Sequence, residues 1–290
     1  LCMILFFILY YLFIKSRKKR NVCLVIGDVR RSPRMTYHAI AFLKHFKGVT
    51  LVGERDRKSV DPILPVPLTA DAEFEYYDIG VIDVPTFLPR FIQLPLKFFI
   101  QLFSIFLVFI RILPINILLV QNPPSVPVLG FCALFRLLRL VANFTVDWHN
   151  YGHTLLSIGS NSKILLFYSK IYQIAEFFFA RFADTHICVS KAMKNDLIKK
   201  SFQEQKIKVF YDKPSSLFKP YVGTDILKDR LEFFYETNEL NKFKNYLWKN
   251  TALIVSSSSW TDDEDFDILL SALKKYDNKI QKLQLPSILC

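Results

Sequence analysis

Short apolar runs rich in strand-forming residues alternate with stretches of helical periodicity along most of this chain. The strand-like runs cover residues 22–26, 49–52, 117–121, 141–147, 186–189 and 209–211. The helical stretches cover residues 33–46, 126–138, 163–182 and 191–199. This alternation predicts an α/β fold, in which helices cover both faces of a mostly parallel sheet. Polar and proline-rich residues 54–73 interrupt the pattern and predict a loop.

A second, shorter run of the same pattern begins near residue 251. Its members are strand-like residues 252–256, helical residues 262–276 and strand-like residues 287–290. Thr261 and Glu264 have the spacing of a capping box, which predicts the start of the helix. One and a half βα units cannot bury their own apolar faces, so we expect this second domain to be truncated at residue 290.

These two patterns divide the chain into domains. We predict a first Rossmann-like domain over residues 21–216, a linker or loop over residues 217–250, and the beginning of a second Rossmann-like domain over residues 251–290. The middle segment is rich in Lys, Asn, Glu, Phe and Tyr without a clear period, which is typical of a connection.

Composition and motifs exclude several classes of protein. The 51% hydrophobic and 22% charged residues are ordinary for a folded chain and exclude wholesale disorder, collagen and a coiled coil. None of the eight glycines forms GxGxxG or a P-loop. Five cysteines without a CxxC motif predict buried thiols in a reducing compartment. The lack of HExxH predicts no metal site, and the lack of a basic stripe interleaved with aromatic residues predicts no nucleic-acid partner.

The N-terminus predicts a membrane helix. Residues 1–14 are uninterrupted apolar, and five of residues 15–20 are basic. Fourteen residues span about 21 Å as a helix, against about 30 Å for the hydrocarbon core. Because the charges follow the apolar run, we predict that residues 1–20 form a membrane anchor with the body in the cytosol. The alternative is an uncleaved helix at the membrane interface.

A second apolar stretch covers residues 91–113, bracketed by Pro95 and Pro114. Its uncharged part between Lys97 and Arg111 has 13 residues, too few to span a membrane comfortably. It predicts either an in-plane helix on the membrane surface or a fully buried core helix. The net charge of +12 fits an anionic membrane face or a substrate that carries phosphate.

Polar clusters follow the predicted strands, where open α/β sheets bind their ligands. Gly27, Asp28, Arg31 and Arg34 lie between the first strand and a helix, an arrangement that suits a phosphate. The cluster at Asn122 is either a ligand site or a plain turn.

The richest cluster is DWHNYGH, residues 147–153. Asp147 and His149 supply a candidate general base, and Asn150 and Tyr151 supply sugar-type hydrogen bonds with a stacking ring. Its alternative is structural capping.

Two later loops complete the candidates. Lys213 follows the strand-like run at 209–211 and could meet phosphate. Ser258, Ser259 and Trp260 precede the helix of the second domain, where small hydroxyl residues and free amides make a diphosphate cradle. The acids that follow them are better explained as first-turn dipole partners than as metal ligands.

Six ordered blocks carry a resemblance to a known family. GDVRRSPRMTYHA, LLVQNPPSVP, VDWHNYGHT, FADTHICVSKAM, YDKPSSLF and VSSSSWTDDEDFDILLSAL resemble the eukaryotic chitobiosyldiphosphodolichol β-mannosyltransferase family. The resemblance runs from the N-terminus to residue 290, with divergent stretches at about 54–90 and 219–249. Arg30 stands where the family usually has glycine.

The resemblance implies a GT-B glycosyltransferase with inverting chemistry, GDP-mannose as donor and dolichol-diphosphate-linked chitobiose as acceptor. It also implies no cofactor, the cytosolic face of the endoplasmic reticulum membrane, and other glycosyltransferases of the pathway as partners. On this interpretation residues 21–216 are the acceptor-side domain, and residues 251–290 begin the donor domain.

Within that frame we assign roles to the candidate residues. Asp147 or His149, with Asp28, would be the base or orient the sugar. Arg31 and Arg34 would meet the lipid diphosphate, with Gly27, Asn122, Asn150, Tyr151 and Lys213 beside the acceptor. Ser258, Ser259 and Trp260 would hold the donor diphosphate. The rival is a truncated, non-catalytic membrane protein that binds the acceptor lipid or partner transferases.

Overall fold

The computed structural model describes residues 10–55, 73–80, 90–157, 162–213, 251–254, 265–283 and 286–289. The chain divides into two compact units, residues 1–212 and 213–290. The predicted linker, residues 217–250, lies outside the described residues.

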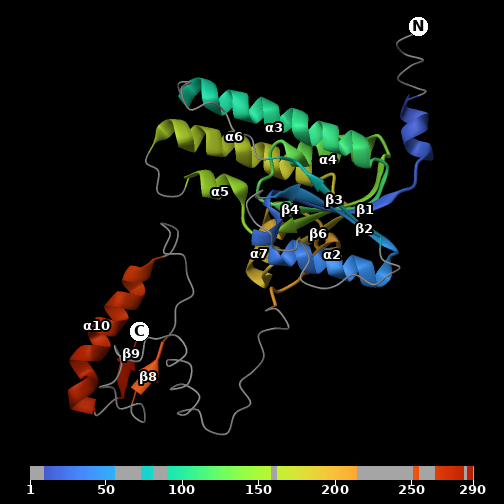
Figure 1. Cartoon of the computed structure of the whole chain (residues 1–290). Helices are drawn as coiled ribbons and strands as arrows, with labels where there is room; N and C mark the ends of the chain where they lie inside the picture. The colour runs from blue at the N-terminus through green and yellow to red at the C-terminus, as the bar shows by residue number, and fades with distance from the viewer. Residues whose placement is uncertain are drawn as a thin grey trace. The chain divides into compact units, whose positions relative to one another are not determined.

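A seven-stranded parallel sheet forms the centre of the first unit (Figure 1). Its strands are β1 (Arg20–Asp28), β2 (Gly48–Glu54), β3 (Glu73–Asp78), β4 (Ile115–Asn122), β5 (Val141–Trp148), β6 (Thr185–Cys188) and β7 (Ile207–Val209). Their order in the sheet is β3-β2-β1-β4-β5-β6-β7, and each neighbouring pair is parallel. The order reverses between β1 and β4, which is where open sheets of this kind form a ligand crevice.

Helices cover both faces of this sheet. They are η1 (Val29–Arg31), α2 (Pro33–His45), α3 (Arg90–Ile112), α4 (Val128–Leu137), α5 (Gly152–Ser157), α6 (Lys163–Ala180), α7 (Lys191–Lys199) and η2 (Glu204–Lys206). Met35 and Ala39 of α2 pack on one face of the sheet. Phe109 of α3 and Leu129 of α4 pack on the other, the side on which Figure 1 also shows α6.

The central strands are buried along their whole width. Four consecutive residues of β1, Val22–Val25, are 0–3% exposed. Continuous burial of this kind arises because helices cover both sheet faces. The predicted α/β fold with a parallel sheet is confirmed.

Several elements differ from the prediction in their presence or in their bounds. The structure contains β3, which the sequence pattern missed because its residues alternate acids with aromatics at the sheet edge. The last strand of the first unit is β7 at 207–209, two residues before the predicted 209–211. In the second unit, β8 (Thr251–Leu253) pairs in parallel with β9 (Ser287–Leu289), and α10 (Phe266–Leu283) connects them.

The long apolar stretch forms α3, and it is neither wholly buried nor wholly exposed. Ile105, Phe109 and Ile112 are at most 1% exposed and belong to the core. Phe99 and Phe103 are each 61% exposed. The fully buried core helix is therefore not what forms: α3 has one face in the core and one exposed apolar face, and contact of that face with a membrane stays a prediction.

Part of the predicted N-terminal anchor, residues 1–9, lies outside the described residues. Residues 10–16 are helical, and Arg17 donates to the carbonyl oxygens of Ile110 and Arg111 at the end of α3. Among the residues that the structure describes, none of the helices combines the length and apolarity needed to cross a membrane.

Candidate active site

The ends of β1, β4 and β5 bring together most of the predicted polar residues. Gln121 pairs with Asp147, and Asn122 pairs with Trp148, in the register of β4 and β5. The backbone N–H of His149 then donates to the carbonyl oxygen of Asn122 at 2.9 Å. The loop that follows β5 is thus held against the end of β4, next to the reversal of strand order.

Asp147 is the buried centre of this cluster. Its side chain is 0% exposed, and the Arg34 guanidinium binds it through two hydrogen bonds, Nε to Oδ2 at 2.7 Å and Nη2 to Oδ1 at 2.9 Å. One turn further along α2, Nε2 of His38 lies 3.1 Å from Oδ2. Buried carboxylates need such partners because desolvation disfavours their charge.

These contacts set the protonation state of Asp147. Burial by itself raises the pKa of this carboxyl, but His149, His38 and Arg34 outweigh burial and hold the pKa well below its usual range. A carboxylate with so low a pKa is a poor proton acceptor at neutral pH. The geometry therefore favours an orienting role for Asp147 over a role as base.

His149 has a ring nitrogen that makes no hydrogen bond in the described part of the chain. Its Nε2 is buried and has no hydrogen-bond partner among the described residues. The distance from this atom to Oδ2 of Asp147 is 3.7 Å, beyond a hydrogen bond. Since unpartnered buried nitrogens are rare, this atom makes His149 a candidate for contact with a ligand. The side chain is 24% exposed, so the ring also reaches solvent.

Arg34 has a different environment from the one expected. We predicted that it meets a lipid diphosphate, whereas its guanidinium is occupied by Asp147, by the carbonyl oxygen of Phe210 and by Asp212, the last two at 2.8 Å. Its side chain is 6% exposed. The physical reason is that buried Asp147 requires a cation, and the first turn of α2 is the nearest place for one. Arg34 thus holds Asp147 and the end of the first unit together.

The loop after β1 is closed by an ion pair. Gly27 has φ +126°, a conformation that favours glycine, and the register of β1 against β2 shifts between Leu24 and Asp28. Asp28 caps η1 by accepting from the Arg30 backbone N–H and binds the Arg30 guanidinium at 3.0 Å. The residue that departs from the family pattern therefore neutralises Asp28. Arg31 ends η1, and its side chain lies outside the described set.

The remaining predicted residues divide into supporting and outlying groups. Asn122 is 0% exposed and donates to Glu176. Asn150 is exposed. The Tyr151 hydroxyl donates to Asp196 at 2.6 Å, and burial together with that carboxylate raises its pKa, so it acts as a donor and not as a base. Lys213 is exposed and is the first residue of the second unit.

The candidate donor loop cannot be placed in this cluster. Ser258, Ser259 and Trp260 lie outside the described residues. In the part of the chain that is described, no group of three or more His, Cys, Asp and Glu side chains could hold a metal ion.

Two residues of the site were missed by the sequence analysis. His38 contacts Asp147. It lies four residues after Arg34, a spacing that puts both side chains on one face of the helix and could have identified it. Glu176 binds Asn122, Gly152 and His153, and its signal was a single acid inside the apolar helix sequence QIAEFFFA. Acids inside apolar helices are rarely buried without partners.

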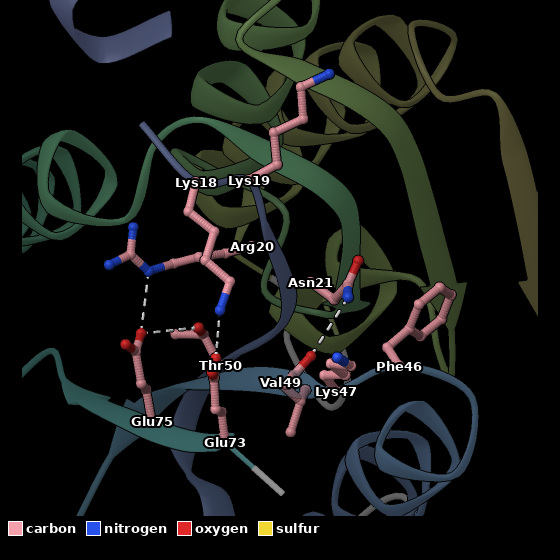
Figure 2. Close-up of a pocket in the computed structure, with 11 residues that line it drawn as sticks. Lys18, Lys19, Arg20, Asn21, Phe46, Lys47, Val49, Thr50, Glu73 and Glu75 are labelled. Atoms are coloured by element: carbon pink, nitrogen blue, oxygen red, sulfur yellow. Dashed lines mark hydrogen bonds and ion pairs between the residues drawn. The ribbon is translucent and has the colours of Figure 1, made fainter. Parts of the chain in front are cut away.

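A separate cavity of about 220 Å³ lies at the opposite end of the strands, where β1 and β2 begin (Figure 2). Lys18 binds Glu73 at 2.5 Å and Arg20 binds Glu75 at 3.0 Å across it. These ion pairs attach the segment after the predicted anchor to the edge strand β3. The cavity is remote from His149 because strands of a parallel sheet all begin at one edge and end at the other.

Comparisons with known proteins show which family the sequence belongs to. Residues 57–212 match the model of Glycosyltransferase Family 4. The chain is 32% identical to a chitobiosyldiphosphodolichol beta-mannosyltransferase of Debaryomyces hansenii, over 95% of this chain and 57% of the relative. Proteins of the same name from Kluyveromyces lactis and Homo sapiens are 33% and 31% identical, over 98% and 95% of this chain and 62% of each relative.

The chain thus spans about three fifths of the length of these relatives. Among solved structures, UDP-GlcNAc 2-epimerase from Neisseria meningitidis has a TM-score of 0.39 and 15% identity over 89% of this chain and 62% of that chain, a likeness too weak to support an argument. The resemblance to the β-mannosyltransferases is confirmed by the named relatives. Because the family model covers more than half of its residues, the chain belongs to glycosyltransferase family 4.

Proposed function

We propose that this chain is the acceptor-side part of an inverting β-1,4-mannosyltransferase. It would transfer mannose from GDP-mannose to GlcNAc2-diphosphodolichol during assembly of the N-glycan precursor. The names of the relatives at 31–33% identity support the acceptor and the sugar. The observation that carries the proposal is the unpartnered Nε2 of His149 beside the buried Asp147 carboxylate.

An inverting transfer is a single displacement at the anomeric carbon. The acceptor 4-hydroxyl oxygen attacks this carbon from the face opposite GDP, and the bond to the phosphate oxygen breaks as GDP leaves with its electron pair. The hydroxyl proton passes to a base, for which His149 is placed. Asp147 then stabilises the imidazolium that forms, because its low pKa keeps it negatively charged.

This assignment distributes the chemistry over two domains. The ends of β1, β4 and β5 would hold the acceptor. The second unit would begin the donor domain of a GT-B enzyme, with Ser258, Ser259 and Trp260 at the donor diphosphate. The displacement needs a base and stabilisation of the departing GDP, and GDP-mannose enters as substrate, so we propose no cofactor.

The exposed surface of α3 and α6 supports binding of the protein to a membrane. Large apolar side chains are exposed along both helices, and both pack against α4. Their most exposed members are Phe99, Phe103, Ile164, Phe167 and Ile174, each 61–68% exposed. Apolar patches of this kind mark interaction or membrane surfaces. We propose that they rest on the endoplasmic reticulum membrane, with the body on its cytosolic face.

A transfer assay tests the proposal. Native protein containing this chain, purified from microsomes, is given GDP-mannose and a chitobiose diphosphate lipid of short chain length. We expect a product that β-mannosidase trims back to the acceptor. Binding of the acceptor without any transfer would overturn the enzyme assignment and favour a non-catalytic protein that binds the acceptor lipid.

A further inference from the structure

Glu176 of α6 is a fully buried carboxylate that contacts two strand-end loops at once. Its Oε1 accepts from Nδ2 of Asn122 at 2.8 Å, Oγ of Ser125 at 2.6 Å and the backbone N–H of Gly152 at 2.8 Å. Its Oε2 lies 2.6 Å from Nδ1 of His153. Asn122 and Ser125 follow β4, whereas Gly152 and His153 follow β5, so one side chain joins the two loops.

Donors from four residues surround this carboxylate, so only a side chain with two acceptor oxygens can satisfy all of them. Gln173 donates through Nε2 to Nε2 of His153 at 3.1 Å, so Nδ1 of that ring carries the proton that Glu176 accepts. A glutamine at 176 would point an N–H₂ group at some of these donors. A leucine would leave all of them buried and unpaired, which is costly.

The network continues from Glu176 to the candidate base. The same Asn122 whose amide binds Glu176 accepts the His149 backbone N–H on its own carbonyl oxygen at 2.9 Å. Its Nδ2 also lies 3.3 Å from the carbonyl oxygen of Asn150. The loop is therefore held at its first residues by Asn122 and at Gly152 and His153 by Glu176.

We propose that Glu176 is a positioning residue for the transfer reaction, which acts through Asn122 and Gly152 to fix the loop that carries His149. This inference rests on the proposed function and adds to it a group that contacts no substrate. A fully buried carboxylate is expensive to maintain, and geometry at the reacting centre is a reason to retain it. Displacement of a reacting group by about 1 Å can lower a rate by about 100-fold.

The first test reads the His149 ring directly and needs no activity. The full chain is labelled with ¹⁵N-histidine, and His149→Gln assigns the ring resonances. We expect Glu176→Gln to move the His149 signals, whereas those of exposed His45 on α2 stay in place. Unchanged His149 signals in folded Glu176→Gln protein would overturn the inference.

Asp184→Asn is the matched control. Asp184 also accepts a backbone N–H, from Phe144 at 2.8 Å, and binds the Arg136 guanidinium, but it lies just before β6, at the edge of the sheet where strands begin. This variant loses a carboxylate of similar structural use and should leave His149 unchanged. If Glu176→Gln does not fold, Ser125→Ala removes one donor to the same carboxylate and should move the His149 signals in the same direction. Unchanged signals there would also contradict the inference.

The second test separates positioning from stability. At a temperature where all variants are folded, we expect Glu176→Gln to lower kcat by about 10- to 100-fold, with the KM for GDP-mannose changed by less than about threefold. Asp184→Asn should keep the parent kcat. Equal losses in both variants would assign Glu176 to stability alone. If the parent transfers no mannose, the proposed function fails, while the histidine signals still decide this inference.

Discussion

Nε2 of His149 lies 3.7 Å from Oδ2 of Asp147, an oxygen that Nε2 of His38 approaches to 3.1 Å. Two imidazoles therefore face one buried carboxylate oxygen, and only His38 is within hydrogen-bonding distance. His38 is held in place by this contact, whereas Nε2 of His149 has no hydrogen-bond partner among the described residues. The asymmetry separates a residue that supports Asp147 from the residue that we propose as the base.

Replacement of His149 tests that separation. General bases contribute about 10²- to 10⁴-fold to a rate, so His149→Ala should lower kcat by a factor in this range. The measurement is mannose transfer from GDP-mannose at saturating acceptor. His45→Ala, at the exposed end of α2, is the control and should keep the parent rate. A near-normal rate for His149→Ala would remove this residue from the role of base.

His186 predicts how the stability of the first unit depends on pH. Burial lowers the pKa of this ring to about 4 from an ordinary value of 6.5, and Nε1 of Trp148 donates to its Nδ1 at 3.3 Å. Because the folded pKa is the lower one, the unfolded chain binds more protons between these values. The contribution is fully present above pH 6.5 and is lost as the pH falls, by about 3 kcal/mol near pH 4.

The variant His186→Asn keeps a hydrogen-bond acceptor for Trp148 but does not titrate. Urea unfolding at several pH values from 7 to 4.5 compares it with the parent. We expect the free energy of unfolding of the parent to fall more steeply than that of His186→Asn. Parallel pH dependence in the two proteins would show that His186 is not a neutral ring in the folded state.

The sequence predicts the central strands well because their residues are buried on both faces. Val22–Val25 reads as one apolar run, and all four residues are buried. The edge strand β3 has no such run, since Glu73 and Glu75 alternate with aromatics. Local pattern therefore identifies the strands in the middle of the sheet, misses the edge strand β3 and shifts the other edge strand, β7, by two residues.

The sequence predicts the site residues that lie close together along the chain. Asp147 and His149 were found because they follow one strand within three residues. His38 is 109 residues from Asp147, and Glu176 is 54 residues from Asn122, so only the fold brings these pairs together. Arg34 was found, but its ion pair with Asp147 depends on the same long-range packing and could not be read from the loop.

We predict that even a single methyl group at Gly152 destabilises the protein. A Cβ there would lie 2.6 Å from Cε1 and 2.9 Å from the hydroxyl of Tyr172, whose oxygen accepts the Ser125 backbone N–H. Gly152→Ala should therefore displace Tyr172 and lower the free energy of unfolding by about 1–3 kcal/mol. Urea titration at neutral pH measures the loss.

Gly130 provides the matched comparison within α4. A Cβ there would meet the Phe179 ring at 3.6 Å, which is ordinary contact, and alanine is the better helix former by up to about 1 kcal/mol. Gly130→Ala should leave the protein unchanged or more stable. A Gly152→Ala protein as stable as Gly130→Ala would mean that Tyr172 moves aside freely.

The exposed face of α3 predicts a difference between acceptors in membranes and acceptors in solution. Phe99 and Phe103 are one turn apart on this helix, and each is 61% exposed. If they enter a bilayer, each burial contributes about 1.5–3 kcal/mol, and their joint loss weakens membrane binding by more than about tenfold. The double variant Phe99→Ser with Phe103→Ser should therefore transfer mannose poorly to a long-chain acceptor in phosphatidylcholine vesicles, yet normally to a short-chain acceptor in solution.

Phe46→Ser is the control for that experiment, because Phe46 is also exposed but ends α2 on the other face of the sheet. It should reduce neither activity, and co-sedimentation with the vesicles should follow the vesicle activity in every variant. An equal loss on both acceptors in the α3 variant would indicate damage to the fold, since a soluble acceptor does not need the membrane. Full activity on both would show that α3 does not bring the enzyme to its lipid, so that the N-terminal segment or α6 would have to do so.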